Sequence, residues 1–394
     1  MSSVLFDLTI LSTETKVRGI GRYLSELARA LARASSASDG LSVRFLERSD
    51  WAGRGVISED AEVAITRLIE RPWRDTRYGW AYRQRVGMAR AVRAGKVDLL
   101  HVGYGHARPL GHFDCPRVVT CHDLIPLLFP EHYSDWQEGW ASGRRWLDAR
   151  RYHGADHVIA ISRATADDLM RLLELPAKKI SIVPNGIDLS KWKPQPSVRD
   201  AGARARFHVE ARPYLVYAGD ADWRKNAEGM LAGLAGARAR LKGEDLCLVW
   251  AGLLREDRRR GVIERARAFG VEEALILTGF VSDDELHALY RGALAALFVS
   301  HAEGFGYPVL EAMALGCPVI TSNCSSLPEL AEGAALLVDP KNHAAIADAI
   351  LTMAESGNER KRLIELGKAR SKTFSVERQA RDTLEVYAAV LGAR

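Results

Sequence analysis

Two glutamates eight positions apart, Glu303 and Glu311, mark the segment of this chain whose residue types are best suited to chemistry. Gly304 and Gly306 lie between them and allow backbone N–H groups to approach a ligand closely. Pro308 favours the first turn of a helix, and a helix start attracts anions. Glu303 can then accept hydrogen bonds from sugar hydroxyls, and Glu311, about one turn into the helix, can hold a ribose. The segment predicts a site for a nucleotide attached to a hydroxyl-rich group; the alternative is two surface residues flanking a tight turn.

A second candidate loop follows the apolar run at residues 214–219 and carries Arg224 and Lys225. At the carboxyl end of a strand these two cations are placed to neutralise a diphosphate, Arg224 through directed donors and Lys225 as a mobile point charge. The alternative is a solvated basic turn. Asp220 and Asp222 beside them resemble a D-x-D metal motif, but the two neighbouring cations already supply the positive charge of a metal, so no metal site is predicted.

Two further segments give weaker signals. Gly19 and Gly21 open a helical pattern after the first apolar run, where glycines can bring the backbone close to a phosphate. The full G-x-G-x-x-G pattern is absent, and an ordinary helix start is the alternative. His122 and Asp123 follow the apolar run at residues 117–120. A histidine there can donate to a developing alkoxide or orient a hydroxyl, and the alternative is a structural histidine.

Residues 71–96, from Arg71 to Lys96, form a strongly basic stretch with eight basic residues and one acid. Four aromatic side chains are interleaved with the charges: Trp73, Tyr78, Trp80 and Tyr82. One interpretation is a solvated basic helix. The other is a patch that contacts anionic lipid headgroups or an anionic acceptor, at the periphery of a membrane.

Apolar runs alternate with helical patterns along the whole chain, which predicts an α/β protein with parallel sheets. In the first half, strands are expected near residues 4–6, 41–45, 99–102, 117–120, 158–160 and 180–183. In the second half, they are expected near residues 214–219, 247–252, 274–278, 293–299, 318–321 and 335–338. Residues 20–32 and 162–173 have helical patterns, and Ser162 suits a helix N-cap. A polar, proline-rich linker at residues 191–197 separates the halves. We therefore expect two Rossmann-like domains facing across a cleft.

Size and composition argue against a nucleic-acid-binding, zinc-binding or membrane-spanning protein. The chain has 394 residues, is 47% hydrophobic and carries a formal charge of +5, too weak to predict a nucleic-acid partner. Five scattered cysteines without a C-x-x-C pair favour reduced thiols over a zinc site. No apolar run reaches the roughly 18 residues that indicate a membrane span. The start of the chain lacks a basic signal-peptide region, so we expect a cytoplasmic protein.

Taken together, the motifs resemble those of the family-4 retaining glycosyltransferases of the GT-B fold, nearly from end to end of the chain. They comprise residues 19–23, 122–123, 160–165, 183–188, 224–226, 279–282, 303–311, 323–329 and 337–340. The resemblance implies an acceptor-side domain of residues 1–189 plus 376–394, with the last helix crossing back to it. It also implies a nucleotide-sugar-binding domain of residues 190–375.

The resemblance also implies roles for individual residues. Catalytic positions are Glu303, which contacts the transferred sugar, and His122, near its reacting side. Glu311 holds the donor ribose. The donor phosphates are bound by Arg224, Lys225, Phe305 and Gly306, with Gly19 and Gly21 near the phosphates or the acceptor. Such enzymes use neither metal nor other cofactor. Some relatives carry a basic residue soon after the position of Gly219, where this chain has Asp220, which leaves more of the phosphate charge to Arg224 and Lys225.

Within the family, residues 120–130 and 322–329 are most similar to bacterial mannosyltransferases of polysaccharide assembly. This implies transfer of a hexose, mannose, from GDP-mannose to a saccharide or lipid-linked saccharide, at the inner face of the membrane. No residue pattern separates guanine from uracil, so a UDP-sugar-dependent transferase is the alternative.

No carboxylate is identified as a nucleophile for a double displacement. We therefore expect a same-face reaction in which the leaving diphosphate takes the acceptor proton. Three rival hypotheses are a nucleotide-sugar epimerase of the same fold, a phosphorylase-like enzyme with pyridoxal phosphate, and a non-catalytic nucleotide-sugar-binding module. The presence of Glu303, Glu311 and Lys225 together argues against the last of these.

Overall fold

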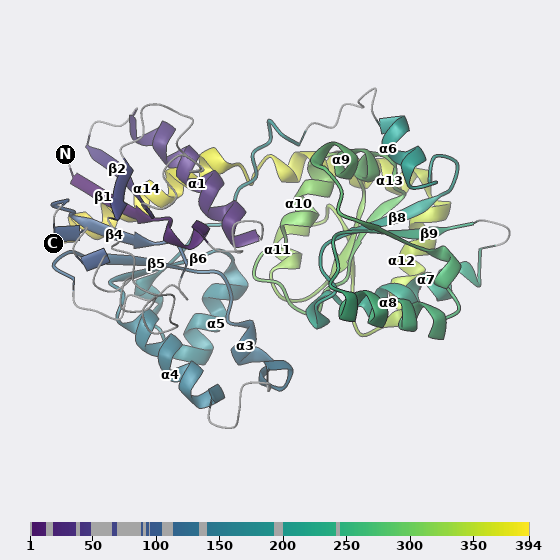
Figure 1. Cartoon of the computed structure of the whole chain (residues 1–394), viewed down its shortest axis with the longest axis horizontal. Coiled ribbons are helices and arrows are strands. Elements are labelled where there is room, and N and C mark those ends of the chain that lie inside the picture. The colour runs from purple at the N-terminus through teal and green to yellow at the C-terminus, as the bar shows by residue number, and fades with distance from the viewer. Residues whose placement is uncertain are drawn as a thin grey trace. The chain divides into compact units, whose positions relative to one another are not determined.

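The chain divides into two units, Met1–Gly186 with Ser375–Arg394, and Ile187–Phe374 (Figure 1). A computed structural model describes residues 2–12, 19–36, 40–48, 65–68, 88–89, 92–93, 95–104, 113–133, 140–192, 200–241 and 245–393. Each unit is built on one parallel sheet, as the alternation of apolar runs and helical patterns predicts.

The sheet of the first unit has the strand order β3-β2-β1-β4-β5-β6-β7 in the described residues, with every neighbouring pair parallel. Its strands are β1 Ser2–Asp7, β2 Leu41–Arg48, β3 Ile65–Leu68, β4 Leu99–Val102, β5 Arg117–Cys121, β6 His157–Ala160 and β7 Ile180–Ile182. The strand order reverses between β1 and β4, which makes this edge a topological switch point, the kind of position at which parallel sheets bind ligands.

The helices of the first unit come from the first half of the chain and from its C-terminal segment. They are η1 Thr9–Ser12, α1 Gly19–Ser36, α3 Ile125–Leu128, η4 Pro130–Tyr133, α4 Trp140–His153, α5 Arg163–Leu173, η5 Ala177–Lys179 and α14 Val376–Gly392. The C-terminal helix α14 packs against α1, which confirms that the last helix crosses back to the N-terminal unit (Figure 1). Ser162 caps α5 as predicted, because its hydroxyl accepts from the Thr165 N–H.

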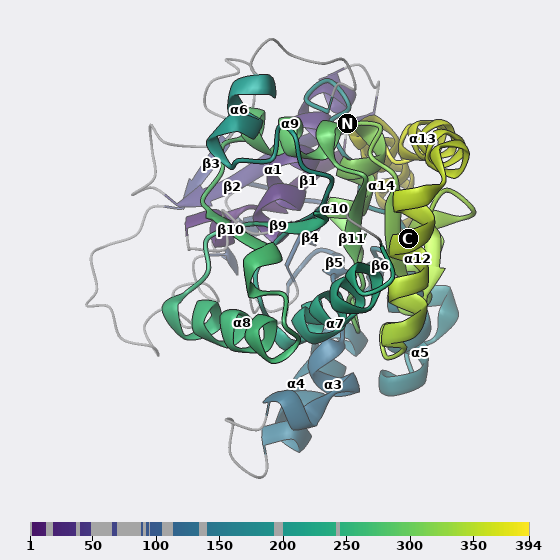
Figure 2. The ribbon, with the colours of Figure 1, turned by 90° about the vertical axis from the view of Figure 1, so that its right-hand side faces the viewer.

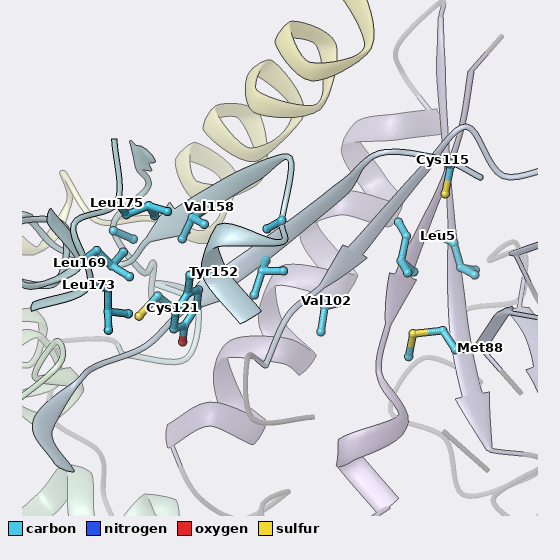
Figure 3. Close-up of a cluster of buried hydrophobic side chains, with 14 of the residues drawn as sticks. Leu5, Met88, Val102, Cys115, Cys121, Tyr152, Val158, Leu169, Leu173 and Leu175 are labelled. Carbon is cyan, nitrogen blue, oxygen red and sulfur yellow. The ribbon is translucent and has the colours of Figure 1, made fainter. Parts of the chain in front are cut away.

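The core of the first unit explains why its strands are nearly continuous apolar runs. Leu5, Val102, Cys121 and Val158 come from four strands and pack with Leu169 of α5 in one buried cluster (Figure 3). A parallel sheet with helices over its faces buries both sides of each strand, so the usual apolar–polar alternation is lost.

The sheet of the second unit has the strand order β10-β9-β8-β11-β12-β13, again entirely parallel in its strand pairs. Its strands are β8 Tyr214–Ala218, β9 Cys247–Ala251, β10 Leu275–Gly279, β11 Ala295–Phe298, β12 Val319–Ser322 and β13 Leu336–Val338. The order reverses between β8 and β11, which places the loops after these two strands on either side of a topological switch point.

The second unit carries the helices α6 Asp200–Arg206, η6 Trp223–Lys225, α7 Ala227–Arg238, α8 Glu256–Ala268, η7 Glu272–Ala274, α9 Asp283–Gly292, α10 Tyr307–Ala314, α11 Leu327–Ala331, α12 His343–Glu355 and α13 Gly357–Ser371. Helices α7 and α12 lie side by side (Figure 2). Their close approach depends on Gly233, where an added Cβ would come 2.4 Å from the Ile346 side chain. Ser282 and Glu285 form a capping box that starts α9.

All twelve strands expected from the sequence are present, and the α/β fold class is confirmed. Strand β3 was not predicted, because four residues with two polar side chains give no periodic signal. The basic stretch lies outside the described residues except at 88–89, 92–93 and 95–96, and the linker does so from residue 193 onward. In the described part of the chain, no helix is both long and apolar enough to cross a membrane.

Candidate active site

The loops that follow β8 and β11 carry most of the donor-side residues that the sequence singled out. The first contains η6, and the second, residues 299–306, leads into α10. The backbone joins the two loops directly, because the N–H of His301 donates to the carbonyl oxygen of Arg224 at 2.7 Å. The strand order therefore brings together two sequence motifs that lie nearly 80 positions apart.

An ion pair between Lys225 and Glu303 spans these loops. Lys225 Nζ lies 2.5 Å from Glu303 Oε1, and the Ser300 hydroxyl donates to the same oxygen at 2.9 Å. The side chains of Lys225 and Glu303 are 20% and 15% exposed, so the pair is largely shielded from water. Burial alone would raise the pKa of the Glu303 carboxyl, but Lys225, Arg224 and Ser300 lower it below its ordinary value. Glu303 is therefore a carboxylate at neutral pH.

Arg224 belongs to a second charged group on the same side of the sheet. Its Nε donates to Asp222 Oδ1 at 2.9 Å. Arg258, in the first turn of α8, pairs with Asp220 at 2.7 Å and with Asp222 at 3.4 Å. No local pattern pointed to Arg258, because its partners lie 36 and 38 positions away along the chain.

The Asp220 and Asp222 carboxylates are thus both engaged by arginine. Burial would raise the pKa of Asp222, but Arg224 and Arg258 lower it overall. Across the described residues, no group of three or more His, Cys, Asp or Glu side chains is arranged to hold a metal ion. The two aspartates of this D-x-D therefore form an ion-pair network with Arg224 and Arg258.

Two serines before α11 hold the Glu303 loop from the β12 side. The Ser325 hydroxyl donates to the carbonyl oxygen of Glu303 at 2.6 Å and accepts from the N–H of Glu303 at 3.1 Å. The buried Ser326 hydroxyl donates to the carbonyl oxygen of Phe305 at 2.7 Å. The sequence motifs assigned no function to these serines, which fix the loop backbone around the carboxylate.

The start of α10 follows from the conformation of Gly306. This residue has φ +119°, and an added Cβ would come within 2.8 Å of Leu327, so the position requires glycine. The Phe305 ring is buried and packs edge-on against Tyr307 and Phe374. Any contact between Phe305 and a phosphate therefore has to come from its backbone. Glu311 lies one turn into α10 and is buried at 5% exposure.

Glycines lie at the carboxyl ends of three neighbouring strands, and two of these glycines are followed by exposed apolar residues. Gly219 and Gly252 follow β8 and β9, Gly279 ends β10, and an added Cβ on Gly252 would come 2.5 Å from the Gly219 carbonyl oxygen. The residues that come next after Gly252 and Gly279, Leu253 and Phe280, are 77% and 73% exposed. Two large apolar side chains thus face solvent at the edge where a parallel sheet binds ligands. Phe280 belongs to the motif at residues 279–282, to which no role was assigned, and Leu253 belongs to none of the motifs.

In the first unit, His122 lies directly after β5. Its Nε2 donates to the carbonyl oxygen of Gly103 at 2.8 Å, and Tyr23 packs edge-on against its ring with centroids 4.7 Å apart. Burial lowers the pKa of His122, so the ring is neutral with its proton on Nε2. Asp123 instead serves the backbone, because its Oδ1 accepts from the Ile125 N–H at the start of α3.

The chain matches two families of glycosyltransferases. Residues 17–191 match the family described as Glycosyltransferase Family 4, and residues 199–370 match Glycosyl transferases group 1. The chain is 32% identical over 364 residues to the GDP-mannose-dependent alpha-(1-6)-phosphatidylinositol monomannoside mannosyltransferase of Mycobacterium tuberculosis, covering 89% of this chain and 88% of that protein.

The chain belongs to glycosyltransferase family 4.

This family-4 glycosyltransferase is also 28% identical over 276 residues to the O-antigen chain mannosyltransferase B of Escherichia coli, covering 68% of this chain and 69% of that protein. It spans only 41% of the length of the E. coli serotype-specific mannosyltransferase WbdA, to which it is 24% identical over 355 residues. Among solved structures, the sucrose-phosphate synthase of Thermosynechococcus elongatus has a TM-score of 0.78 and 21% identity, covering 100% of both chains. The resemblance read from the motifs and the GT-B fold are confirmed.

The predicted site residues of the glycosyltransferase fall into two sets, one in each unit. Arg224, Lys225 and Glu303 meet at the switch point of the second unit, and Phe305, Gly306 and Glu311 follow in the same loop and helix. Gly19 and Gly21 begin α1 of the first unit, which also carries His122.

The first unit of the glycosyltransferase also holds a buried polar network that no sequence motif revealed. His101 Nδ1 lies 2.5 Å from the Tyr387 hydroxyl, and His101 Nε2 lies 2.8 Å from the Thr120 hydroxyl. Thr120 in turn meets the Tyr23 hydroxyl at 2.9 Å. Burial and the nearby His122 lower the pKa of His101 to about 3, so its ring is neutral. Because 286 positions separate His101 from Tyr387, no local pattern could reveal their contact.

Proposed function

We propose that this glycosyltransferase moves mannose from GDP-mannose to a saccharide or lipid-linked saccharide with retention of configuration. The observation that carries the proposal is the shielded Lys225–Glu303 ion pair, which spans the loops on either side of the β8/β11 switch point. It offers one cation for a diphosphate and one carboxylate for sugar hydroxyls within a single contact. The names of the relatives, which include a GDP-mannose-dependent enzyme, support mannose as the transferred sugar.

The donor would lie along the carboxyl edge of the second sheet. Arg224, Lys225 and the backbone N–H groups at the start of α10 would hold the diphosphate, and Glu311 would hold the ribose. The base would lie toward Leu253 and Phe280, whose exposed side chains offer it an apolar surface. Strands β8 and β10 are two strand spacings apart, about 10 Å, so the edge is wide enough for these groups to be contacted in sequence.

The reaction that this site supports best is a same-face displacement. The bond between the anomeric carbon and the diphosphate oxygen breaks, and the acceptor oxygen bonds to the same face of that carbon. The leaving diphosphate takes the acceptor proton, and Arg224, Lys225 and the α10 N–H groups stabilise its developing charge. Glu303 is ionised and paired with Lys225, which suits it to orient the sugar hydroxyls.

The acceptor would bind to the unit that carries His122, with residues 1–189 plus 376–394 as the acceptor-side domain and residues 190–375 as the donor domain. Because His122 Nε2–H is engaged by Gly103, Nδ1 is the atom suited to meet a ligand. An Nδ1 acceptor can orient a sugar hydroxyl, whereas it cannot donate to a developing alkoxide. We therefore assign His122 the orienting role of the two that its sequence position suggested.

Thermal-shift titration with GDP, UDP and ADP tests the proposal, followed by incubation with the matching sugar nucleotides and a mannose-terminated acceptor. We expect the largest shift with GDP and sugar transfer from GDP-mannose. A larger shift with UDP would replace the donor by a UDP-sugar. Release of free nucleotide together with an epimerised sugar, without acceptor, would instead indicate an epimerase.

A further inference from the structure

Asn226 directly follows Lys225, and its buried side chain uses its whole carboxamide. Nδ2 donates to the carbonyl oxygen of Val299 at 2.9 Å and to that of Pro340 at 2.8 Å. Oδ1 accepts from the N–H of Gly229 at 2.9 Å. The backbone of Asn226 has φ +57°, a left-handed conformation that asparagine tolerates better than most residues.

The three partners of this carboxamide belong to three different segments around the proposed donor site. Gly229 is in the first turn of α7, Val299 follows β11, and Pro340 follows β13. Val299 immediately precedes Ser300, whose hydroxyl binds the Glu303 carboxylate. Together with the backbone hydrogen bond from His301 to Arg224, this side chain sets how far the Lys225 loop lies from the Glu303 loop.

We propose that Asn226 is a positioning residue for donor binding: its carboxamide holds Lys225 and Glu303 at the spacing that a sugar diphosphate requires. The inference rests on the proposed function, because the ligand it concerns is the nucleotide diphosphate sugar. Asn226 itself need not touch the donor, since its hydrogen-bonding atoms are directed at the backbone of the three segments.

The Asn226 carboxamide can make all three of these hydrogen bonds because it has both a donor group and an acceptor oxygen. Its partners are two acceptors and one donor, so an aspartate at this position would direct carboxylate oxygens at two carbonyl oxygens. Asn226→Asp should weaken GDP binding about tenfold at neutral pH while guanosine binding stays unchanged. Protonation of the new carboxyl restores one donor, so the GDP affinity of Asn226→Asp should recover as pH is lowered. Asn226→Gly tolerates the left-handed backbone but has no side chain, and its affinity should not recover.

A substitution at Gly229 can displace the Asn226 carboxamide while Asn226 itself is kept. An added Cβ on Gly229 would come 2.4 Å from Asn226 Nδ2 and 2.8 Å from Oδ1, so Gly229→Ala should push the carboxamide away from its partners. The matched control is Gly202→Ala in α6, where an added Cβ meets nothing within 4 Å. Both changes replace a helical glycine by alanine, so they share the same gain in helix propensity. We expect weaker GDP binding only in Gly229→Ala.

A double-mutant cycle on GDP binding tests the positioning role, with calorimetry of wild type, Lys225→Ala, Asn226→Gly and the double variant. If Asn226 acts through the spacing of Lys225 and Glu303, the double variant should bind GDP about as weakly as Lys225→Ala alone. Additive losses, or unchanged GDP binding in Asn226→Gly, Asn226→Asp and Gly229→Ala, would overturn the positioning role. Failure of the wild-type protein to bind GDP or any other nucleoside diphosphate would instead overturn the proposed function.

Discussion

Glu303 and Glu311 lie on one continuous loop and helix but in different positions, and this difference predicts different kinetic effects. Glu303 is paired with Lys225 in the loop, where it can face the sugar as charge develops at the anomeric carbon. Glu311 lies on α10, where it would hold the ribose in ground and transition states alike. We expect Glu303→Gln to lower kcat with little change in nucleotide affinity, and Glu311→Ala to raise the donor KM.

Steady-state kinetics of the two glutamate variants decide this assignment. An unchanged donor KM in Glu311→Ala, or full kcat in Glu303→Gln, would contradict it. GDP binding by Glu303→Gln serves as the control, because a misfolded site would lose affinity as well as turnover.

The neutral state of His122 gives a prediction about pH. Burial lowers the pKa of His122 below its ordinary value near 6.5, so the ring stays neutral as pH falls through that range. We expect no acid limb from this residue in kcat/KM between about pH 6 and 8. Profiles of wild type and His122→Gln test it: a limb near pH 6.5 present only in the wild type would show that the histidine titrates there.

At the scale of elements, the loop after β8 is held by ion pairs, one within the loop and two with Arg258 of α8. Asp220 and Asp222 are engaged by Arg224 and Arg258, so the D-x-D is already neutralised by arginine. We therefore expect transfer in excess EDTA to equal transfer with magnesium. Loss of activity in EDTA that manganese restores would show that these carboxylates serve a metal after all.

The elements themselves were predictable because their signals are local. Apolar runs indicated the strands, and the alternation with helices indicated parallel sheets, which in turn places the loops after β8 and β11 at one edge. Contacts between distant residues had no such signal. The pairing of Arg258 with Asp220 and Asp222, and the junction that Asn226 makes among three segments, depend on the finished fold.

In the first unit too, contacts between residues far apart in the sequence could not be predicted. His122 was identified from its position after a strand, but the network of His101, Thr120, Tyr23 and Tyr387 joins strands to the first and last helices. Such a network forms only when α14 packs on α1, which the sequence indicates through the family resemblance and not through any spacing.

At the scale of the whole molecule, we predict peripheral contact with anionic membranes through residues 71–96. Their eight basic residues and one acid, with Trp73 and Trp80 among them, suit an anionic interface at about 1 kcal/mol per basic residue. In liposome flotation, binding should require anionic lipid and weaken with salt. Equal binding to neutral vesicles, or no binding to either kind, would leave the stretch as a solvated face.

The central claim is that the second unit binds a nucleotide diphosphate sugar through the loops joined by Lys225 and Glu303. Calorimetry of GDP and guanosine with wild type and Lys225→Ala tests it most directly, with Arg224→Ala as a second variant. We predict that each variant loses about 1.5–3 kcal/mol of GDP binding free energy and little of guanosine binding. Equal losses for GDP and guanosine would contradict the claim that these cations hold the diphosphate.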